Sequence, residues 1–186
     1  YPLAVLLDDD RHTISADLFV NGNIHAHTFE YDYEGREPNW CLGPDYVLLR
    51  DPIRRRAAET PPWRTPPETI LVTLGGSDIQ NTTPTVLRAL DGLDTRLVVI
   101  VGPGFTNREA IRVAETEIDT PIHLLENPDD LPTQMFEADL AVSACGSSVY
   151  ELFALGTPFV GLVQADNQRD IADVLRNEEL ATVLPM

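Results

Sequence analysis

Two stretches of small residues stand where an apolar strand would give way to a helix, a position at which proteins often bind phosphate. The first is Gly75-Gly76-Ser77-Asp78, with Asn81 close behind it. Glycines there let backbone N–H groups approach an anion, and the start of the following helix adds a favourable partial charge. The stretch is neither a Walker loop nor a dinucleotide fingerprint. A turn needed only for chain reversal is the alternative, and the residues alone leave both open.

The second stretch is Gly146-Ser147-Ser148, with Glu151 following one helical turn later. One interpretation is a capping box, in which Ser148 and Glu151 satisfy the first N–H groups of the helix. The other is that the small residues leave room for a phosphate group. Glu151 would then accept hydrogen bonds from two ribose hydroxyls, as acidic residues do in dinucleotide-binding folds.

A third stretch, Asn167-Gln168, also lies between an apolar run and a helical pattern. Asn167 either caps the last helix or faces a cleft. Because crossover connections place the carboxyl ends of parallel strands at the same edge of a sheet, we expect the three loops to converge there.

The elements that position these loops follow from the alternation of short apolar runs with amphipathic segments. We expect strands at 70–74, 97–101, 121–125, 140–143, 159–163 and 182–184, and helices at 82–90, 108–117, 131–137, 148–155 and 167–176. Short buried strands between helices predict an α/β fold with a doubly wound parallel sheet.

The region before residue 69 is less regular. We expect strands at 3–7, 17–20 and 46–49, a long loop at 24–41, and a linker at 54–67, where four prolines fall within seven residues. The sequence therefore predicts a boundary between residues 1–66, a first zone with its linker, and residues 67–186, a doubly wound domain.

Composition narrows the range of functions. The chain has 186 residues and a net charge of −17, and all 13 basic residues are arginines. This charge indicates either adaptation to high salt or an acidic interaction surface, and it argues against nucleic acid as a partner. No apolar run is long enough to span a membrane. Cys41 and Cys145 are typical of a reduced, cytoplasmic protein, and His25 and His27 lack a third ligand, so we predict no metal and no cofactor.

The ordered set of motifs resembles the GT-B enzymes of nucleotide-sugar metabolism. Gly-Gly-Ser-Asp with Asn81, Gly-Ser-Ser-x-x-Glu and Asn167-Gln168 are similar to the family 28 glycosyltransferases, which include the murein lipid II synthase. The stronger resemblance is to the UDP-sugar hydrolase of the pseudaminic acid pathway and its spore-coat polysaccharide relatives. It rests on Leu7-Asp8-Asp9, the segments 17–21 and 32–35, and Gly43-Pro-x-Tyr46-x-Leu-Leu-Arg50.

That resemblance implies that the first zone, residues 1–66, is the later part of an N-terminal lobe with its linker. It also implies that residues 67–186 are a complete Rossmann-like domain that binds UDP or a UDP-sugar. Gly75, Gly76, Ser77 and Asp78 would line the phosphate end with Asn81 nearby, Leu125 and Glu126 would meet uracil, Gly146, Ser147 and Ser148 would meet the pyrophosphate, Glu151 would bind the ribose, and Asn167 and Gln168 would face the sugar. From the first lobe, Asp9, Asn21 and Tyr46 are expected at the cleft. Asp9, Tyr46 and Asn167 are also expected to support catalysis.

The chain departs from this group in one respect. The group's first lobe opens with a Gly-rich loop carrying a histidine base, and His12, His25, His27 and His123 do not lie in such a motif. The catalytic residue is therefore unassigned, and we expect the chain to begin midway through that lobe and to stop slightly early. Hydrolysis of a UDP-sugar, transfer of its sugar to an acceptor, and binding without chemistry remain three distinct hypotheses.

Overall fold

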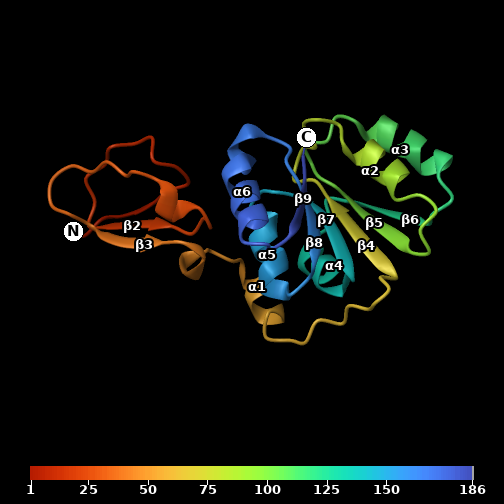
Figure 1. Cartoon of the computed structure of the whole chain (residues 1–186), viewed down its shortest axis with the longest axis horizontal. Coiled ribbons are helices and arrows are strands. Elements are labelled where there is room, and N and C mark those ends of the chain that lie inside the picture. The colour runs from red at the N-terminus through yellow and green to blue at the C-terminus, as the bar shows by residue number, and fades with distance from the viewer. Residues whose placement is uncertain (186) are drawn as a thin grey trace. The chain divides into compact units, whose positions relative to one another are not determined.

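The computed structural model describes residues 1–185, and these form two compact units that divide between Leu49 and Arg50. The boundary predicted from the sequence lies later in the chain, between residues 66 and 67. Each unit contains a parallel sheet; the second unit is α/β, and the first combines its three strands with two short 3-10 helices. Figure 1 shows the second unit, which carries most of the predicted site residues, with its strands and helices labelled.

The second unit is built on a six-stranded parallel sheet with the order β6-β5-β4-β7-β8-β9. The strands are β4 (Thr69–Thr73), β5 (Arg96–Val101), β6 (Ile122–Glu126), β7 (Leu140–Ala144), β8 (Phe159–Leu162) and β9 (Thr182–Leu184). All five residues of β4 are buried, because β4 lies in the middle of the sheet and is covered on both faces. The predicted fold class, an α/β doubly wound sheet, is confirmed.

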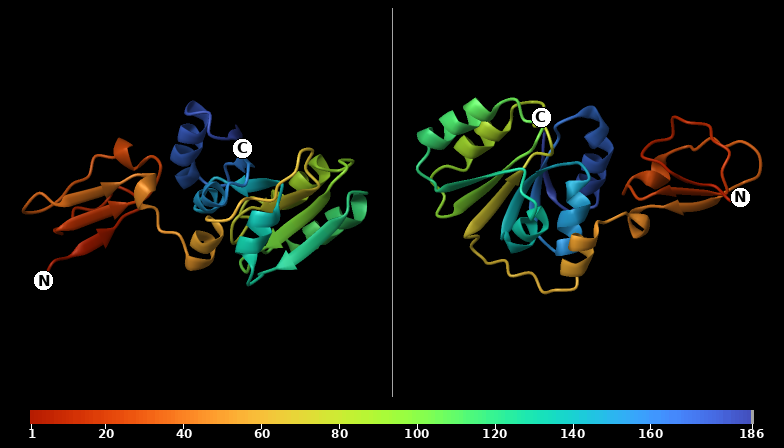
Figure 2. Two further views of the ribbon diagram at one scale, coloured as in Figure 1. Left: turned by 90° about the horizontal axis from the view of Figure 1, so that it is seen from below. Right: turned by 180° about the vertical axis from the view of Figure 1, so that it is seen from behind.

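Helices cover both faces of this sheet. They are α1 (Asp51–Arg56), α2 (Thr83–Ala89), α3 (Arg108–Glu117), α4 (Leu131–Glu137), α5 (Ser148–Leu155) and α6 (Arg169–Asn177). Figure 2 shows α2 and α3 together on one face and α4 with α5 on the other. The core under α2 and α3 contains Ile70, Val99 and Leu87, of which Val99 and Leu87 are fully buried. The predicted helices are therefore confirmed, except that a 3-10 turn, Asp166–Gln168, precedes α6.

The segment that we predicted to be a linker from residue 54 onward begins inside a helix. α1 contacts α4 and α5. Its Ile53 side chain is fully buried, and the Arg56 guanidinium donates to the Thr133 hydroxyl at 2.7 Å and lies over the Phe136 ring. The prediction was wrong for residues 54–56 because three consecutive arginines look like an exposed segment, while the contacts that hold the helix, the burial of Ile53 and the contacts of Arg56, cannot be read from the sequence.

One carboxylate, that of Asp139 just before β7, holds the proline-rich segment that leads from α1 into β4. The Asp139 side chain is fully buried and accepts hydrogen bonds from the backbone N–H groups of Arg64, Glu68 and Thr69 at 2.6, 3.0 and 2.9 Å. Backbone N–H groups that would otherwise be buried without a partner are thereby satisfied. Asp139 therefore fixes the path by which the chain enters β4.

The first unit has a smaller parallel sheet with the order β1-β2-β3, made of Ala4–Leu6, Leu18–Asn21 and Asn39–Leu42. The strand expected at 46–49 is absent among the described residues, since Tyr46 ends a 3-10 helix, Pro44–Tyr46. The third strand instead occupies Asn39–Leu42, at the end of the predicted loop. Trp40 on this strand stacks on Phe19 at 5.0 Å between ring centroids. That contact recruits the segment into the sheet although its sequence does not alternate.

We expect Asp139→Asn to lower the free energy of unfolding by about 2 kcal/mol, because three backbone donors lose a charged acceptor and two of them face an amide of the wrong polarity. Urea unfolding at neutral pH measures this change. Asp94→Asn, at an exposed residue, is the control and should leave the urea midpoint unchanged. Equal midpoints for the two variants would contradict an anchoring role for Asp139.

Candidate functional site

The order of strands in the second unit reverses between β4 and β7. From β4 the chain moves outward through β5 to β6, then returns to pair β7 against the other side of β4, with Thr73 opposite Ser143. The loops after β4 and β7 therefore leave the same sheet edge as neighbours and diverge toward opposite faces. In open α/β sheets this switch point is where ligands bind.

The loop after β4 leaves two glycines open to solvent. Gly75 has a φ of +79° and neither Gly75 nor Gly76 has an atom within 4 Å of the place where a Cβ would stand. Ser77 beside them is partly exposed. Their backbone is therefore accessible to a ligand of the size of a phosphate.

The Asp78 side chain is buried and engaged by neighbouring groups. Only 4% of it is exposed, and its carboxylate accepts the N–H groups of Thr82 and Thr83, at 2.9 and 3.0 Å, and the Asn107 amide at 2.7 Å. Asn81 has a φ of 55° and accepts the same Asn107 amide. Asp78 thus holds the start of α2, and both predicted binding residues contact the Asn107 side chain.

A fourth loop, which sequence reasoning missed, braces Gly76. The Gly104 N–H donates to the Gly76 carbonyl at 2.9 Å. A Cβ on Gly102 would stand 2.5 Å from the same carbonyl oxygen. The run Gly102-Pro103-Gly104 directly after a predicted strand was the signal that could have found this contact.

The loop after β7 does not form the capping box. α5 begins at Ser148, and Ser147 in the N-cap position makes no side-chain hydrogen bond to the helix. The Glu151 carboxylate instead accepts two hydrogen bonds from the Arg50 guanidinium, at 2.6 Å from Nε and 2.8 Å from Nη2. The side chain of Glu151 keeps 17% of its surface exposed. The capping interpretation is therefore wrong in this structure, and Glu151 remains accessible in the first turn of α5.

The loop after β8 connects the other two. Its Gln164 carbonyl accepts the Gln80 amide from the loop after β4, at 2.8 Å. Its Gln168 side chain accepts the Gln164 N–H at 2.8 Å and lies 3.6 Å from where a Cβ on Gly146 would stand. The expected convergence of three loops is thus observed. Asn167 is exposed on the 3-10 turn and does not cap α6.

Leu125 and Glu126 end β6, beside β5. The Arg108 guanidinium donates to the Glu126 carboxylate and, at 3.2 Å, to the Gly102 carbonyl. The Arg112 guanidinium lies 3.7 Å from the same carboxylate. The β6 end is therefore tied by Arg108 to the loop that braces Gly76, while the Glu126 side chain itself is engaged by arginines.

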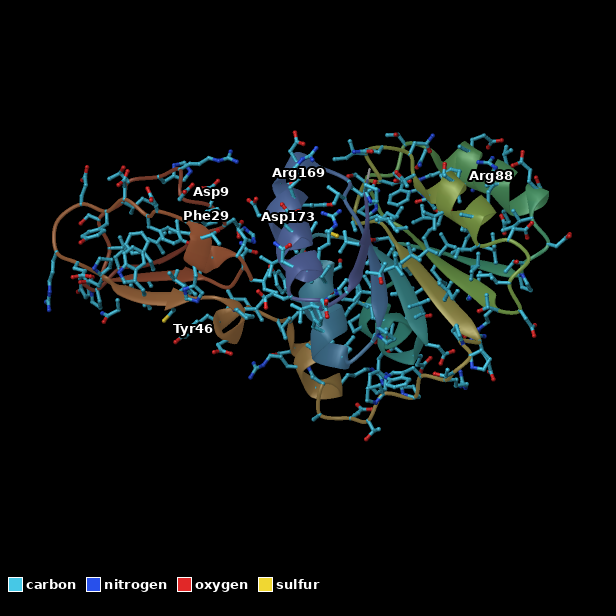
Figure 3. The ribbon with its side chains drawn as sticks, in the orientation of Figure 1. Asp9, Phe29, Tyr46, Arg88, Arg169 and Asp173 are labelled. Carbon is cyan, nitrogen blue, oxygen red and sulfur yellow. The ribbon has the colours of Figure 1, made fainter. Side chains whose placement is uncertain are left out.

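The three candidates in the first unit do not converge. Asn21 is buried and donates to the Tyr31 hydroxyl at 2.9 Å. Asp9 pairs with Arg11 at 3.2 Å. Figure 3 shows Asp9 and Tyr46 on separate segments of this unit. Of the three candidates, Tyr46 lines a pocket of about 460 Å³; the other lining residues are His27, Tyr31, Trp40 and Leu42.

Other groups with reactive potential are disposed as follows. Burial raises the pKa of the Cys145 thiol to about 11, so it stays a neutral thiol at neutral pH.

Within residues 1–185 no three His, Cys, Asp or Glu side chains gather in a way that could hold a metal ion. None of the helices in the same range is long and apolar enough to cross a membrane. A cavity of about 940 Å³ lies at the opposite end of the sheet, by Trp63 and Phe153, and includes none of the three loops.

Two curated proteins resemble the chain in sequence, and no protein-family model matches it. It is 31% identical over 170 residues to the spore coat polysaccharide biosynthesis protein SpsG of Bacillus subtilis strain 168, covering 89% of the chain and 49% of that relative. It is 28% identical over 166 residues to the uncharacterized protein MJ1062 of Methanocaldococcus jannaschii, covering 85% of the chain and 34% of that protein. The chain thus spans about half the length of SpsG and a third of the other relative.

Solved structures share the fold. MurG of Acinetobacter baumannii matches with a TM-score of 0.62 and 16% identity over 99% of this chain and 53% of its own. A structure described as the glycotransferase of kitacinnamycin matches with a TM-score of 0.54 and 18% identity over 91% of this chain and 42% of its own. At these identities they show the fold alone. SpsG supports the resemblance to the spore-coat polysaccharide proteins, and the two solved structures support the fold.

We expect Gly102→Ala to disturb the loop after β4, because the added methyl group cannot stand 2.5 Å from the Gly76 carbonyl oxygen. Hydrogen exchange of the backbone amides in 75–81 should accelerate relative to the wild type. Pro103→Ala, at the exposed neighbour, is the control. Unchanged exchange in 75–81 of the Gly102 variant would show that the two loops are not coupled.

Proposed function

We propose that the second unit binds the UDP part of a UDP-sugar at the switch point between β4 and β7. The diphosphate would lie between Gly75–Ser77 and Gly146–Ser148, and Glu151 would accept the ribose hydroxyls. The observation that carries the proposal is the convergence of the three loops: Gln164 hydrogen-bonds the loop after β8 to the loop after β4, and the Gln168 side chain lies close to Gly146 in the loop after β7. The accessible Glu151 carboxylate at the start of α5 adds to it.

The chemistry of such a site suits an anion held by neutral groups. Open backbone N–H groups at Gly75 and Gly76 and the first turn of α5 supply donors without adding charged side chains. When the bond between the diphosphate and the sugar breaks, negative charge grows on the diphosphate. Fixed donors that are already oriented stabilise that charge as it develops. The second unit would therefore both bind the nucleotide and stabilise the leaving group.

For the whole protein we propose an enzyme that moves the sugar from UDP to an acceptor. The name of SpsG, a spore coat polysaccharide biosynthesis protein, and that of the kitacinnamycin glycotransferase favour an acceptor hydroxyl. Water as the acceptor would give the UDP-sugar hydrolase expected from the motifs. Both reactions use the same UDP site, and a binding module without chemistry would use it too, because the fold does not decide between them.

The catalytic base stays unassigned in this proposal. Asp9, Tyr46 and Asn167 remain candidates for supporting roles, and Asn167 is the one of the three that is exposed beside the converging loops. We place the protein in the cytoplasm, where the two free cysteines Cys41 and Cys145 would remain reduced.

Calorimetry of the chain with UDP, CDP and ADP tests the binding proposal. We expect UDP to bind most tightly, with CDP and ADP weaker by about tenfold or more, the effect of about 1.4 kcal/mol from base contacts. Equal affinities for the three nucleotides would leave only a general phosphate site. No binding of any of them would overturn the proposal.

We expect Glu151→Ala to weaken UDP binding by at least about tenfold, because a hydrogen bond to a charged acceptor contributes about 1.5–3 kcal/mol. The melting temperature should change little, since the side chain does not cap α5. Glu137→Ala, at an exposed carboxylate at the end of α4, is the matched control for the loss of one negative charge. A large drop in melting temperature with unchanged UDP affinity would assign Glu151 a structural role instead.

We also propose adaptation to high salt, which rests on the net charge of −17 and the absence of lysine among the 13 basic residues. Screening of a self-repelling surface should raise the melting temperature as KCl increases from about 0.1 M, where the Debye length is about 10 Å, to about 1 M, where it is about 3 Å. Differential scanning calorimetry at constant pH measures this. A melting temperature that falls over the same range would overturn the adaptation to high salt.

A further inference from the structure

The Arg50 guanidinium binds the carboxylate of Glu151 through two hydrogen bonds, a pairing that the sequence motifs did not predict. Its Nε and Nη2 atoms each donate to a different carboxylate oxygen, at 2.6 and 2.8 Å. The two residues are 101 positions apart in the chain. A planar guanidinium bound in this way fixes the plane of the carboxylate as well as its position.

The arginine is itself anchored. Arg50 occupies the N-cap position of α1, and its carbonyl accepts the N–H groups of Ile53 and Arg54 at 3.1 and 3.2 Å. α1 in turn contacts α5, the helix that carries Glu151, and its Ile53 side chain is fully buried. The guanidinium and the carboxylate are thus presented to each other by two helices that are in contact.

The contact leaves Glu151 able to accept further hydrogen bonds. An ionised carboxylate has about four lone-pair directions, two on each oxygen. Arg50 uses one on each oxygen, which leaves one on each for a pair of neighbouring hydroxyl groups. The side chain keeps 17% of its surface exposed.

We propose that Arg50 is a positioning residue that orients Glu151 for the vicinal diol of a ribose and so makes the site selective for ribonucleotides. The inference rests on the proposed binding of UDP and adds the origin of its sugar specificity. A free glutamate side chain loses rotamer freedom when it binds a diol, whereas one already held by Arg50 has lost it before the ligand arrives. Exposed ion pairs contribute little to folding stability, so the pair is better explained by what it orients.

Calorimetry with UDP and 2′-deoxy-UDP tests the proposal, because the second ligand lacks one of the two hydroxyls that Glu151 would recognise. The wild type should prefer UDP. In Arg50→Gln the preference should fall by about three- to tenfold, the effect of ordering one flexible side chain on binding, with the loss on the UDP side. Arg50→Lys, which keeps the charge and loses the planar fork, should be intermediate.

Arg54→Gln is the matched control, since Arg54 lies on the same helix and its ion pair with Asp51 is largely exposed. It should behave like the wild type, and melting temperatures of all variants should stay close together. An undiminished preference for UDP in Arg50→Gln would overturn the positioning role and leave the UDP site intact. Tighter UDP binding by Arg50→Gln would show that the arginine competes with the ribose, and equal weakening of both ligands would show that it acts on the phosphates.

A failure of the proposed UDP binding gives a different calorimetric result from a failure of the role of Arg50. If the wild type binds neither ligand, the proposed UDP site falls, and the role of Arg50 falls with it. If the wild type binds both equally, Glu151 does not read the ribose, and the positioning role is overturned while nucleotide binding stands.

Discussion

The pairing of β4 with β7 is the interaction on which the candidate site depends. Val72 and Thr73 lie opposite Val142 and Ser143 in parallel register, so both strands end at the same level of the sheet. The chain leaves β4 toward α2 on one face and leaves β7 toward α5 on the other. A space between two diverging loops follows from topology alone, whatever side chains later occupy it.

Given that opening, hydrogen bonds decide its shape. Asp78 holds the start of α2, Gly104 holds the Gly76 carbonyl, and Gln164 ties the loops after β4 and β8 together. None of these groups needs to touch a ligand. They keep the open backbone at Gly75 and Gly76 in one conformation, and a preformed site avoids the cost of ordering the loop when a ligand binds.

Sequence reasoning was most successful where a local pattern and the global fold require the same residues. The runs at β4, β5 and β7 are short, apolar and flanked by helices, so strand positions and the doubly wound fold could be predicted. In the first unit the signals are weaker. β3 (Asn39–Leu42) is recruited by the stacking of Trp40 on Phe19, and α1 by burial of Ile53, and both contacts join residues distant in sequence.

The same limit applies within the site. Small residues after strands identified the loops, since glycine and serine have the small side chains that leave a backbone open to a ligand. The partners of their acidic neighbours were not visible. Asp78 was expected to line the phosphate end, and in the structure its carboxylate accepts hydrogen bonds from the start of α2 and from Asn107. Glu151 fits a capping box by its spacing, but its carboxylate pairs with Arg50. Side-chain partners across 101 positions follow only from the packed fold.

Charge is the remaining problem, because a chain with a net charge of −17 is proposed to bind a diphosphate. The acidic groups around the opening are each offset locally: Asp78 by backbone N–H groups and Asn107, Glu126 by Arg108 and Arg112, and Glu151 by Arg50. Salt screens the distant surface charges over about 10 Å, whereas contacts at hydrogen-bond distance are screened much less. The potential that the proposed phosphate would meet at the opening is therefore set mainly by these paired groups and by the backbone N–H groups of the loops. An acidic exterior would not exclude the proposed anion site, because the two act over different distances.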